Sequence, residues 1–442
     1  MEKIVIVGGG SPYVPGILYS FSQVQKEFAG SNICLMDIDS SRLPLMQKLA
    51  ERMIQEAGAG ITVTSTTDIE EALPEATFVI TSFRSGGIEG LRLDEEIPVK
   101  YGINGQETTG PGGTFFALRS IPPVLELCAK VESICPEAWV VNYVNPVNFV
   151  ADVIQRKTKV KSISICDGGG NGLKYLLPDL LDVEPHRLKL RAAGVNHHNW
   201  LMELTVDGND AYPMLKSAIN QLSEDTTDHR KSISVFKEQA RFLKQFLETY
   251  NVFPANIRYV YPYFNYFDAL DGYRAGGHSL YRMFSKDLPE HWENFKKMAK
   301  GQIPIYMDPD KHHTRVGHGD IAVQIVTTIA TNRTQEFHVN IPNRGCVTNL
   351  PYGAIVEVPA LVDRSGIRPL CMGDLPKGVM GLTSALINWQ ELSVDAALSG
   401  NKDTLMQALL AHPWMRIISL QDARMLGEEM LAAHEKHLPQ FL

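Results

Sequence analysis

The chain has 442 residues, of which 44% are apolar and 21% charged, and its formal charge is -8 at neutral pH. This length exceeds what one hydrophobic core usually organises, so the sequence predicts a globular protein of two domains. The acidic balance, the absence of a basic cluster and the lack of any apolar run approaching about 18 residues argue against a nucleic-acid partner and against a membrane span.

A buried strand followed by three glycines opens the chain. Residues 3–7 alternate and concentrate β-branched side chains, which predicts a buried parallel strand. Glycines at this point let the backbone turn tightly beside a pyrophosphate at a helix N-terminus. We therefore expect Gly8, Gly10 and Ser11 to bind a dinucleotide, although the next glycine, Gly16, comes too late for the usual GxGxxG spacing. The alternative is an ordinary strand, turn and helix in which the glycines serve packing.

The second predicted strand, residues 33–36, ends at an acidic residue. Asp37 stands at its tip, where a carboxylate can accept from a ribose hydroxyl, and this favours NAD+ over NADP+. Helices are expected after Pro15 and from Ser40, and further strands at residues 61–64, 78–81, 139–143 and 163–165. This alternation predicts an α/β fold with an N-terminal Rossmann-like, doubly wound parallel sheet.

The pattern changes near Cys166, after which short strands, turns and helices mix, and from Leu382 onward it is typical of amphipathic helix. We therefore divide the chain into a dinucleotide-binding domain, residues 1–165, and a mixed α+β domain, residues 166–442. The second domain is expected to bind substrate and metal, to hold the catalytic residues and to form the oligomer contacts. The N-terminus enters a strand without a basic and apolar leader, and the six cysteines are scattered. Both features predict a cytoplasmic protein.

Amide side chains follow the strand at residues 139–143. Asn142, Asn145 and Asn148 belong to the segment VNYVNPVN, in which Pro146 stops the strand. Ligands of open α/β sheets bind outside the carboxyl ends of the strands, so these amides could form hydrogen bonds with sugar hydroxyls.

A thiol and an imidazole follow two further predicted strands. Cys166 and Asp167 end one of them, and Asn196, His197 and His198 end the other. A thiolate and an imidazole suit a divalent transition metal, with positions left for substrate oxygens and water. The alternative is a buried cysteine and a hydrogen-bonded histidine without any metal.

Tyrosines are dense in residues 257–277, and Tyr259 and Tyr261 are the candidates for a base, since a tyrosine near a cation loses its proton more easily. Core and interface aromatics are the alternative. Arg92 and Arg274 are interpreted as cations on loops that could fix an anionic group by a forked contact. Solvated surface arginines are the alternative for both.

Motifs in a fixed order along the chain resemble glycoside hydrolase family 4. They are VGGGSPYVPG, GLRLDEEIPVKYGINGQETTGPGG, ALRSIP, VNPVN, the cysteine of SICD and GVNHHNW, followed by RVGHGDIA at residues 315–322 and the stretch at residues 343–370. The QETTGPGG loop and ALRSIP most resemble members that cleave 6-phospho-β-glucosides. Asp167 directly after the cysteine is more similar to members that act on 6-phospho-α-glucosides.

The resemblance implies a hydrolysis without the usual pair of carboxylates. NAD+ takes hydride from C3 of the sugar, a metal ion, Mn2+ or another divalent cation, stabilises the enolate, and a tyrosinate removes the C2 proton. The glycosidic oxygen then leaves, water adds, and the hydride returns, so that no net oxidation results.

The resemblance also implies roles for individual residues. Cys166 and His197 match the metal ligands, Asn145 matches the asparagine that contacts the sugar, and Asp167 stands where some members hold a general acid. Arg92 and Arg274 resemble the arginines that neutralise the phosphate or the enolate, and Asn196 is expected at the substrate.

Two departures from the family's pattern leave alternatives open. Ile257 occupies the place where members usually hold a tyrosine, so the base is Tyr259 or Tyr261. CDGGGN replaces the usual CNVP or CDMP, so a non-phosphorylated or uronic substrate stays open. The partners expected are a small, phosphorylated sugar as substrate and further copies of the chain in a homodimer or homotetramer.

Two rival classes remain at this point. An NAD-dependent 2-hydroxyacid dehydrogenase would share the opening strand and use a histidine with an arginine clamp and no metal. A nucleotide-sensing protein would bind NAD+ without turnover.

Overall fold

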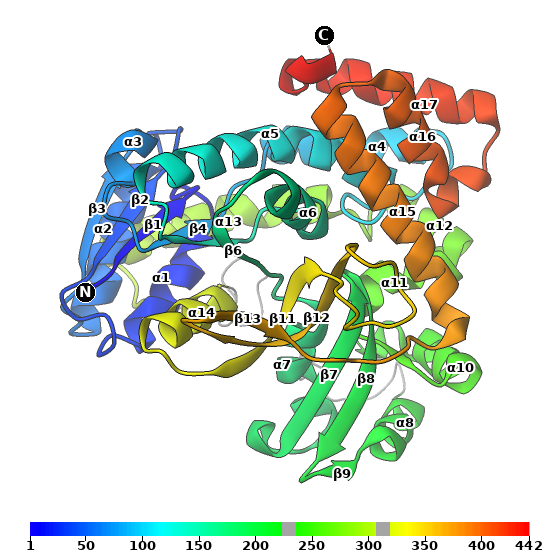
Figure 1. The fold of residues 1–442 in the computed structure, drawn as a ribbon, viewed down its shortest axis with the longest axis horizontal. Coiled ribbons are helices and arrows are strands. Elements are labelled where there is room, and N and C mark those ends of the chain that lie inside the picture. Colours follow the sequence, from blue (N-terminus) through cyan, green and yellow to red (C-terminus); the bar gives the residue numbers. More distant parts are fainter. Residues whose placement is uncertain (223–235, 306–318, 442) are drawn as a thin grey trace.

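A computed structural model describes residues 1–222, 236–305 and 319–441. Within these residues thirteen strands form one sheet, in the order β10-β8-β7-β12-β11-β6-β5-β4-β1-β2-β3, with β13 beside β12 and β9 beside β8 (Figure 1). The strands are β1 (Lys3–Val7), β2 (Asn32–Met36), β3 (Thr62–Thr66), β4 (Phe78–Thr81), β5 (Trp139–Asn142), β6 (Lys161–Ser164), β7 (Leu188–Val195), β8 (His198–Val206), β9 (Asn209–Asp210), β10 (Phe253–Pro254), β11 (Gln335–Pro342), β12 (Ile355–Asp363) and β13 (Gly366–Pro369).

The helices of the described residues surround this sheet. They are α1 (Val14–Gln23), α2 (Leu43–Glu56), α3 (Ile69–Ala72), α4 (Gly87–Lys100), α5 (Pro111–Ile134), α6 (Val147–Lys157), α7 (Gly169–Leu181), α8 (Tyr212–Gln221), α10 (Ala240–Tyr250), α11 (Ile257–Phe264), α12 (Tyr266–Ala275), α13 (Leu280–Ala299), α14 (Asp320–Ala330), α15 (Lys377–Ser399), α16 (Lys402–Ala411) and α17 (Leu420–His434). Short 3-10 turns are η1 (Pro185–Arg187), η2 (Pro413–Arg416), η3 (Glu435–His437) and η4 (Pro439–Phe441).

The first six strands confirm the predicted doubly wound sheet. They pair in parallel in the order β3-β2-β1-β4-β5-β6, the arrangement that binds dinucleotides at its switch point. Successive side chains of a strand face opposite sides, so Ile4 and Ile6 pack with α1 and α2, while Val5 packs with α5 and α6. Helices therefore cover both faces, as a parallel sheet requires.

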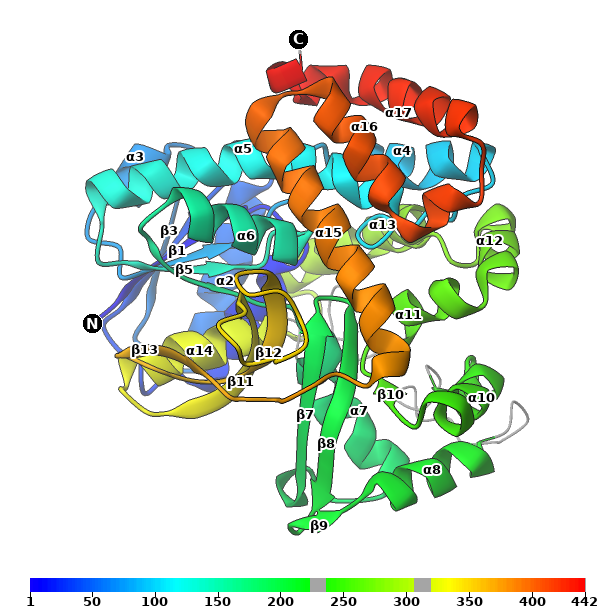
Figure 2. The ribbon, with the colours of Figure 1, turned by 45° about the vertical axis from the view of Figure 1, so that its right-hand side comes forward.

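The later strands confirm the predicted mixed part of the fold. β11, β12, β7, β8 and β10 pair antiparallel along the sheet, and β11 also pairs antiparallel with β6. The β7–β8 hairpin extends away from the parallel strands, with α8 beside it (Figures 1 and 2). The two halves share one sheet, in which β11 joins β6 through the pair of Asn340 with Ser164, so the division at residue 165 stays a prediction.

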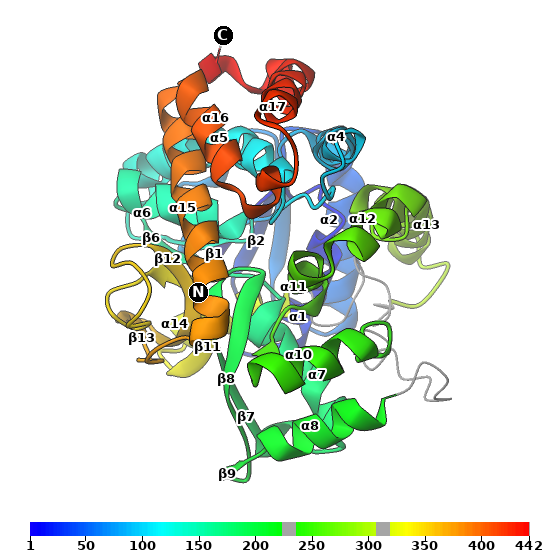
Figure 3. The ribbon, with the colours of Figure 1, turned by 90° about the vertical axis from the view of Figure 1, so that its right-hand side faces the viewer.

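The predicted C-terminal helices pack on the first half of the chain. Figure 2 shows α15 crossing α5 and α6, and Figure 3 shows α12 and α13 on the opposite side of the molecule from α15. The indole of Trp389 donates to Thr114 Oγ1 over 2.8 Å, and Asn148 Nδ2 donates to Gln390 Oε1 over 2.7 Å. No helix of the described ranges is long and apolar enough to cross a membrane.

A buried cluster of an arginine, an aspartate and a histidine joins α4, α5 and α17. Arg119, in ALRSIP, donates to both carboxylate oxygens of Asp94 at 2.9 and 2.6 Å, and His434 Nε2 lies 3.1 Å from the same carboxylate, with all three side chains fully buried. We expect Arg119→Met to lower the free energy of unfolding by about 3–5 kcal/mol, because it leaves Asp94 buried without its cation. Urea unfolding measures this. Lys161→Met, which breaks the exposed pair with Glu137, should cost less than about 1 kcal/mol, and equal losses would contradict the argument.

Candidate active site

The glycine turn after β1 adopts the predicted conformation. Gly8 has a φ of +92°, and a Cβ there would overlap the Ser82 carbonyl, so only glycine fits. Gly10 N donates to Asp37 Oδ2 over 2.8 Å, which brings these two predicted cofactor residues together. Ser11 Oγ accepts from the Tyr13 N–H over 3.3 Å at the start of α1. The carboxylate at the tip of β2 therefore also orders the turn that it faces.

Cys166 and His197 meet, as the sequence predicts. Cys166 follows β6, and His197 lies in the turn between β7 and β8 with a φ of +64°, an uncommon conformation for a residue other than glycine. Cys166 Sγ and His197 Nε2 are 3.4 Å apart. Zinc bonds to sulfur and nitrogen at a tetrahedral angle would separate the two atoms by about 3.5 Å, so the pair could share one ion of this size.

A hydrogen-bond chain orients the imidazole for such a role. Thr108 Oγ1 donates to Gln106 Oε1 over 3.1 Å and lies 3.0 Å from His197 Nδ1. With its own proton committed to Gln106, the Thr108 hydroxyl accepts from Nδ1–H, which leaves the lone pair of Nε2 facing Cys166. Burial lowers the pKa of His197 to about 3, so the ring is neutral, as a metal ligand must be.

The donor set fits an open metal site. Burial raises the pKa of the Cys166 thiol to about 12, and a bound divalent cation would reverse this by favouring the thiolate. Among residues 1–222, 236–305 and 319–441, no third histidine, cysteine or carboxylate completes a cluster around the pair. Two protein ligands leave several positions for substrate oxygens and water, which is the arrangement of a catalytic rather than a structural metal.

The two candidate tyrosines face different surroundings. The ring of Tyr259 stacks on the His197 ring, with centroids 3.9 Å apart and planes 8° from parallel. Tyr261, two residues along α11, instead packs edge-on against Phe242 at 5.3 Å. Residues two apart on a helix point in nearly opposite directions. The geometry therefore favours Tyr259 over Tyr261 as the group that reaches the predicted metal.

Asp167 is held on both carboxylate oxygens. Tyr143 donates its hydroxyl to Oδ1 over 2.7 Å, and Gly319 N donates to Oδ2 over 3.1 Å at the start of α14. Burial raises the pKa of Asp167 to about 6, which keeps part of the population protonated near neutral pH. Of the RVGHGDIA segment, residues 315–318 lie outside the described residues.

The three glycines of CDGGGN allow a close approach behind the metal pair. A Cβ on Gly168 would lie 2.9 Å from Asn256 Nδ2, and a Cβ on Gly170 would overlap the His338 ring. Asn196 Nδ2 donates to Glu357 Oε2 over 2.6 Å in the same buried region. Asn196, which the sequence predicts at the substrate, therefore binds a buried carboxylate on β12. It directly precedes His197, and its contact with substrate stays a prediction.

Of the three predicted amides at the end of β5, two are hydrogen-bonded within the protein and one stays a candidate for the site. Asn142 accepts from Thr81 Oγ1 over 2.9 Å and is fully buried, while Asn148 binds α15. The expectation that these two amides bind sugar is therefore wrong, because their side chains are buried and hydrogen-bonded within the protein. Asn145 is half-buried, with its carbonyl accepting from Ser120 Oγ over 3.0 Å, and stays the candidate amide at the carboxyl end of β5.

The expectation that Arg92 and Arg274 lie on loops is wrong. Arg92 is inside α4 and pairs with Glu89 at 2.6 Å and Glu96 at 2.5 Å on the same helix. Arg274 is in the last turn of α12 and pairs with Asp271 at 3.3 Å. Carboxylates on their own helices pair with both guanidinium groups, and the expectation that these arginines bind an anionic group of the substrate stays a prediction.

Sequence reasoning did not identify Glu107, Thr108 or Arg258. Glu107 and Thr108 belong to the QETTGPGG loop, which resembles the family's loop without distinguishing the roles of its members. Arg258 directly precedes Tyr259 on α11. Burial raises the pKa of Tyr13 well above its usual value, and Glu107, Asp167 and Cys166 add to this rise, so the nucleotide turn and the metal pair share one region.

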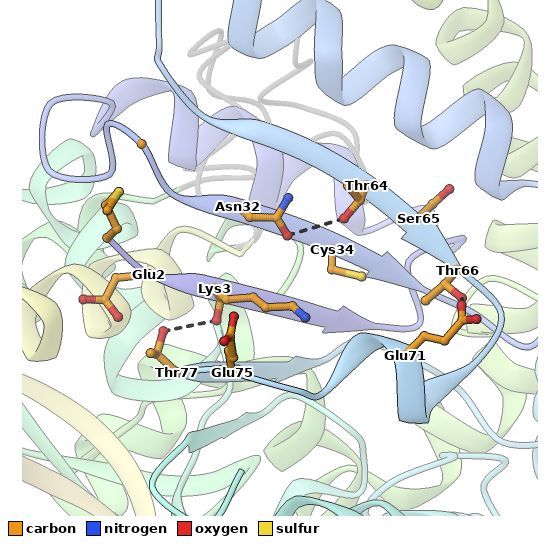
Figure 4. A pocket seen from close by; sticks show the side chains of 12 residues that line it. Glu2, Lys3, Asn32, Cys34, Thr64, Ser65, Thr66, Glu71, Glu75 and Thr77 are labelled. Atoms are coloured by element: carbon orange, nitrogen blue, oxygen red, sulfur yellow. Dashed lines mark hydrogen bonds between the residues drawn. The ribbon is translucent and has the colours of Figure 1, made fainter. Parts of the chain in front are cut away.

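A polar hollow of about 620 Å³ lies elsewhere, over β1, β2 and β3 (Figure 4). Its side chains bind one another and the backbone: Thr64 Oγ1 donates to Asn32 Oδ1 over 3.4 Å, and Thr77 Oγ1 donates to the Lys3 carbonyl over 3.1 Å. None of the predicted site residues lines this hollow.

Comparisons with known proteins agree with the sequence and the fold. A family model described as Family 4 glycosyl hydrolase matches residues 3–183, and a second, for the Family 4 glycosyl hydrolase C-terminal domain, matches residues 192–415. A probable 6-phospho-beta-glucosidase of Bacillus subtilis is 31% identical, covering 99% of this chain and 98% of its own. A maltose-6′-phosphate glucosidase of the same organism is 28% identical, covering 99% and 97%. The 6-phospho-beta glucosidase of Thermotoga maritima, solved with manganese, NAD+ and glucose 6-phosphate, has a TM-score of 0.85 at 22% identity, covering 98% of this chain and 99% of that one.

Proposed function

The chain belongs to the family 4 glycosyl hydrolases, and from this premise we propose that it hydrolyses the O-glycosidic bond of 6-phosphoglucosides, first of all 6-phospho-β-glucosides. The observation that carries the proposal is the approach of Cys166, His197 and Tyr259 at the carboxyl end of a dinucleotide-binding sheet. The alternatives within the family are 6-phospho-α-glucosides, supported by the maltose-6′-phosphate glucosidase, and non-phosphorylated or uronic α-glycosides.

We propose NAD+ and Mn2+ as the cofactors, following the Thermotoga enzyme's complex. The turn at Gly8, Gly10 and Ser11 with Asp37 would hold the first, and Cys166 with His197 the second. When bound, the dinucleotide supplies reversible oxidation of the sugar, and the metal supplies Lewis-acid stabilisation of developing negative charge.

The chain's own groups would then move protons. Tyr259 would accept the proton from C2 of the sugar. Burial raises its pKa far above the usual range, so it needs nearby positive charge, and Arg258 lowers that pKa. Asp167, with a pKa raised to about 6 by burial, would donate to the leaving oxygen, and Asn145 and Asn196 would hold sugar hydroxyls.

Asp37 is expected to select NAD+. Asp37→Asn keeps an oxygen for the Gly10 N–H but removes the charge, so we expect NAD+ to bind about 10-fold more weakly and the preference over NADP+ to shrink. Calorimetric titration with both dinucleotides measures this. Asp39→Asn, which changes the neighbouring exposed aspartate, is the matched control. An unchanged NAD+ to NADP+ ratio in Asp37→Asn would remove the proposed role.

The experiment that tests the function is a panel of nitrophenyl α- and β-glycosides, each with and without a 6-phosphate. The assay contains NAD+, Mn2+ and a reductant. Release of nitrophenol from a 6-phosphoglucoside that requires both cofactors, without net NADH at 340 nm, is the expected result. Net NADH from a 2-hydroxyacid would support the dehydrogenase, and binding of NAD+ with no turnover would support a sensor.

We further propose a cytoplasmic homodimer or homotetramer. Free cysteines throughout the chain and a phosphorylated substrate support the compartment, since both belong to a reducing metabolic environment. Light scattering of the purified chain measures the assembly.

A further inference from the structure

The backbone carbonyl of Thr109 is a meeting point of three distant parts of the chain. His412, which directly follows α16, places its Nε2 2.8 Å from this oxygen, and the ring is fully buried. The hydroxyl of Tyr263, on α11, donates to the same oxygen and lies 3.3 Å from His412 Nε2. A residue from the C-terminal helices therefore contacts both the loop of Thr108 and the helix of Tyr259.

The neighbours of His412 determine which ring nitrogen carries the proton. The Trp414 N–H donates to His412 Nδ1 over 3.2 Å, so Nδ1 is an acceptor. Burial lowers the pKa of His412 to about 3, and a neutral ring with an accepting Nδ1 carries its proton on Nε2. His412 Nε2–H therefore donates to the Thr109 carbonyl. The contact is tight, since a Cβ on Gly110 would lie 3.0 Å from the Trp414 ring.

The path from the Thr109 carbonyl to the proposed metal is short. Gln106 Oε1 accepts from the backbone N–H of Thr108 over 2.7 Å and from that of Thr109. The Thr108 hydroxyl lies 3.0 Å from His197 Nδ1, the ring nitrogen that faces away from Cys166. Because Thr108 and Thr109 share a peptide bond, a shift of the Thr109 carbonyl would also shift the hydroxyl that orients His197.

The same carbonyl is linked to the proposed base. Tyr259 and Tyr263 are four residues apart on α11 and so lie on one face of that helix. The Tyr259 ring stacks on His197 with centroids 3.9 Å apart, and Tyr263 packs edge-on against His198 at 5.2 Å. The hydrogen bond from Tyr263 to Thr109 therefore fixes the turn of α11 that presents Tyr259 to the metal pair.

We propose that His412 is a positioning residue for the metal site: by donating to the Thr109 carbonyl, it holds Thr108 in place against His197. This rests on the proposed function, and it deepens it by assigning a part of the site to a segment about 300 positions further along the chain. Partners that orient a metal-binding imidazole commonly change metal affinity by about 10- to 100-fold when they are removed. His412 is neutral, so it acts through geometry and not through charge.

Two amide substitutions separate the two contacts of His412. His412→Asn places an amide near the position of Nδ1, which keeps an acceptor for Trp414 N–H but does not reach Thr109. His412→Gln places an amide N–H near the position of Nε2, which keeps the donor to Thr109. His412→Leu also lacks that donor and fills part of the space, so it serves as a second variant should His412→Asn not fold.

Calorimetric titration with Mn2+, in the presence of NAD+ and without sugar, is the measurement. Cys166→Ser defines the binding event at the site, because it should lose that event. We expect His412→Asn and His412→Leu to bind Mn2+ about 10- to 100-fold more weakly, and His412→Gln to stay within a few-fold of the wild type. The affinity for NAD+ should be the same in all three His412 variants.

A double-mutant cycle tests whether His412 acts through Thr108. Thr108→Val removes the hydroxyl that faces His197 and should itself weaken Mn2+ binding. Adding His412→Asn to Thr108→Val should then cost little further affinity, because the contact that His412 supports is already gone. Losses that add in full would show that His412 does not act through this hydroxyl, and would overturn the proposal.

Other outcomes also decide the matter. Equal Mn2+ affinity in His412→Asn and His412→Gln, with both less stable to urea than the wild type, would show a purely structural role and overturn the proposal. A wild type that binds no Mn2+, or binds it equally well as Cys166→Ser, would contradict the proposed metal site and this inference with it. Mn2+ binding that depends on His412 in a chain that cleaves no glycoside would contradict only the proposed hydrolysis and leave the role of His412 standing.

Discussion

Cys166→Ser is expected to lower metal-dependent glycosidase activity by about 1,000-fold or more, because it removes one of two protein ligands from the proposed ion. A serine hydroxyl is a much poorer ligand than a thiolate for a transition metal. NAD+ binding should be unchanged, since the glycine turn lies on β1 and not on β6. Initial rates across a Mn2+ titration, with calorimetric titration of NAD+, measure both properties.

Cys371→Ser is the matched control for this variant. Cys371 is a free and exposed cysteine, so the same substitution there should leave the activity and the Mn2+ dependence as in the wild type. Full activity of Cys166→Ser at wild-type Mn2+ concentration would end the ligand assignment.

Tyr259→Phe is expected to lower kcat by about 100- to 10,000-fold, the usual contribution of a positioned base. The phenyl ring can keep the stack on His197, so the loss reports the hydroxyl and not the packing. Washout of deuterium from C2-deuterated substrate into water should fall with kcat, while unchanged calorimetric binding of NAD+ distinguishes a missing base from a misfolded site.

The sequence left open whether Tyr259 or Tyr261 is the base, so Tyr261→Phe is the comparison variant. Because Tyr261 packs edge-on against Phe242 and not on the metal pair, this variant should stay within a few-fold of the wild type. The reverse order, with Tyr261→Phe inactive and Tyr259→Phe active, would show that the base lies on the other side of α11.

The parallel half of the fold could be predicted from the sequence because its signals are local. Short buried β runs, each followed by a turn or a polar residue, predict strands that carry their side chains to one edge of the sheet. β1, β2, β4 and β6 lie within about two residues of the expected ranges, and Gly10 meets Asp37 as expected. The approach of Cys166 to His197 was predicted by the same argument together with the family resemblance.

The arginines could not be placed from the sequence, since their roles depend on which neighbours the fold supplies. Arg92 was interpreted as lying on a loop, but the residues around it form α4, with Gly86 in a left-handed conformation before it and Pro98 in its last turn. Within that helix Glu89 and Glu96 fall at the spacing that pairs with Arg92. The sequence did not single out Arg258 either. Its segment is dense in tyrosines, and only tertiary packing shows which residues of that segment lie near the metal pair.

The same limit applies to Asn142 and Asn148. Asn142 ends β5 and Asn148 follows it at the expected edge. Asn148, however, lies on the face of α6 that meets α15, a contact between residues more than 200 positions apart in the chain. Local patterns carry no information about such a partner.

The most direct test of the account is hydrolysis of a 6-phosphoglucoside in D2O with NAD+ and Mn2+, followed by proton NMR of the sugar product at C2. Proton removal by Tyr259 predicts deuterium at C2 of the released glucose 6-phosphate. A product that retains its original hydrogen at C2 while the glycosidic bond is cleaved would contradict the account.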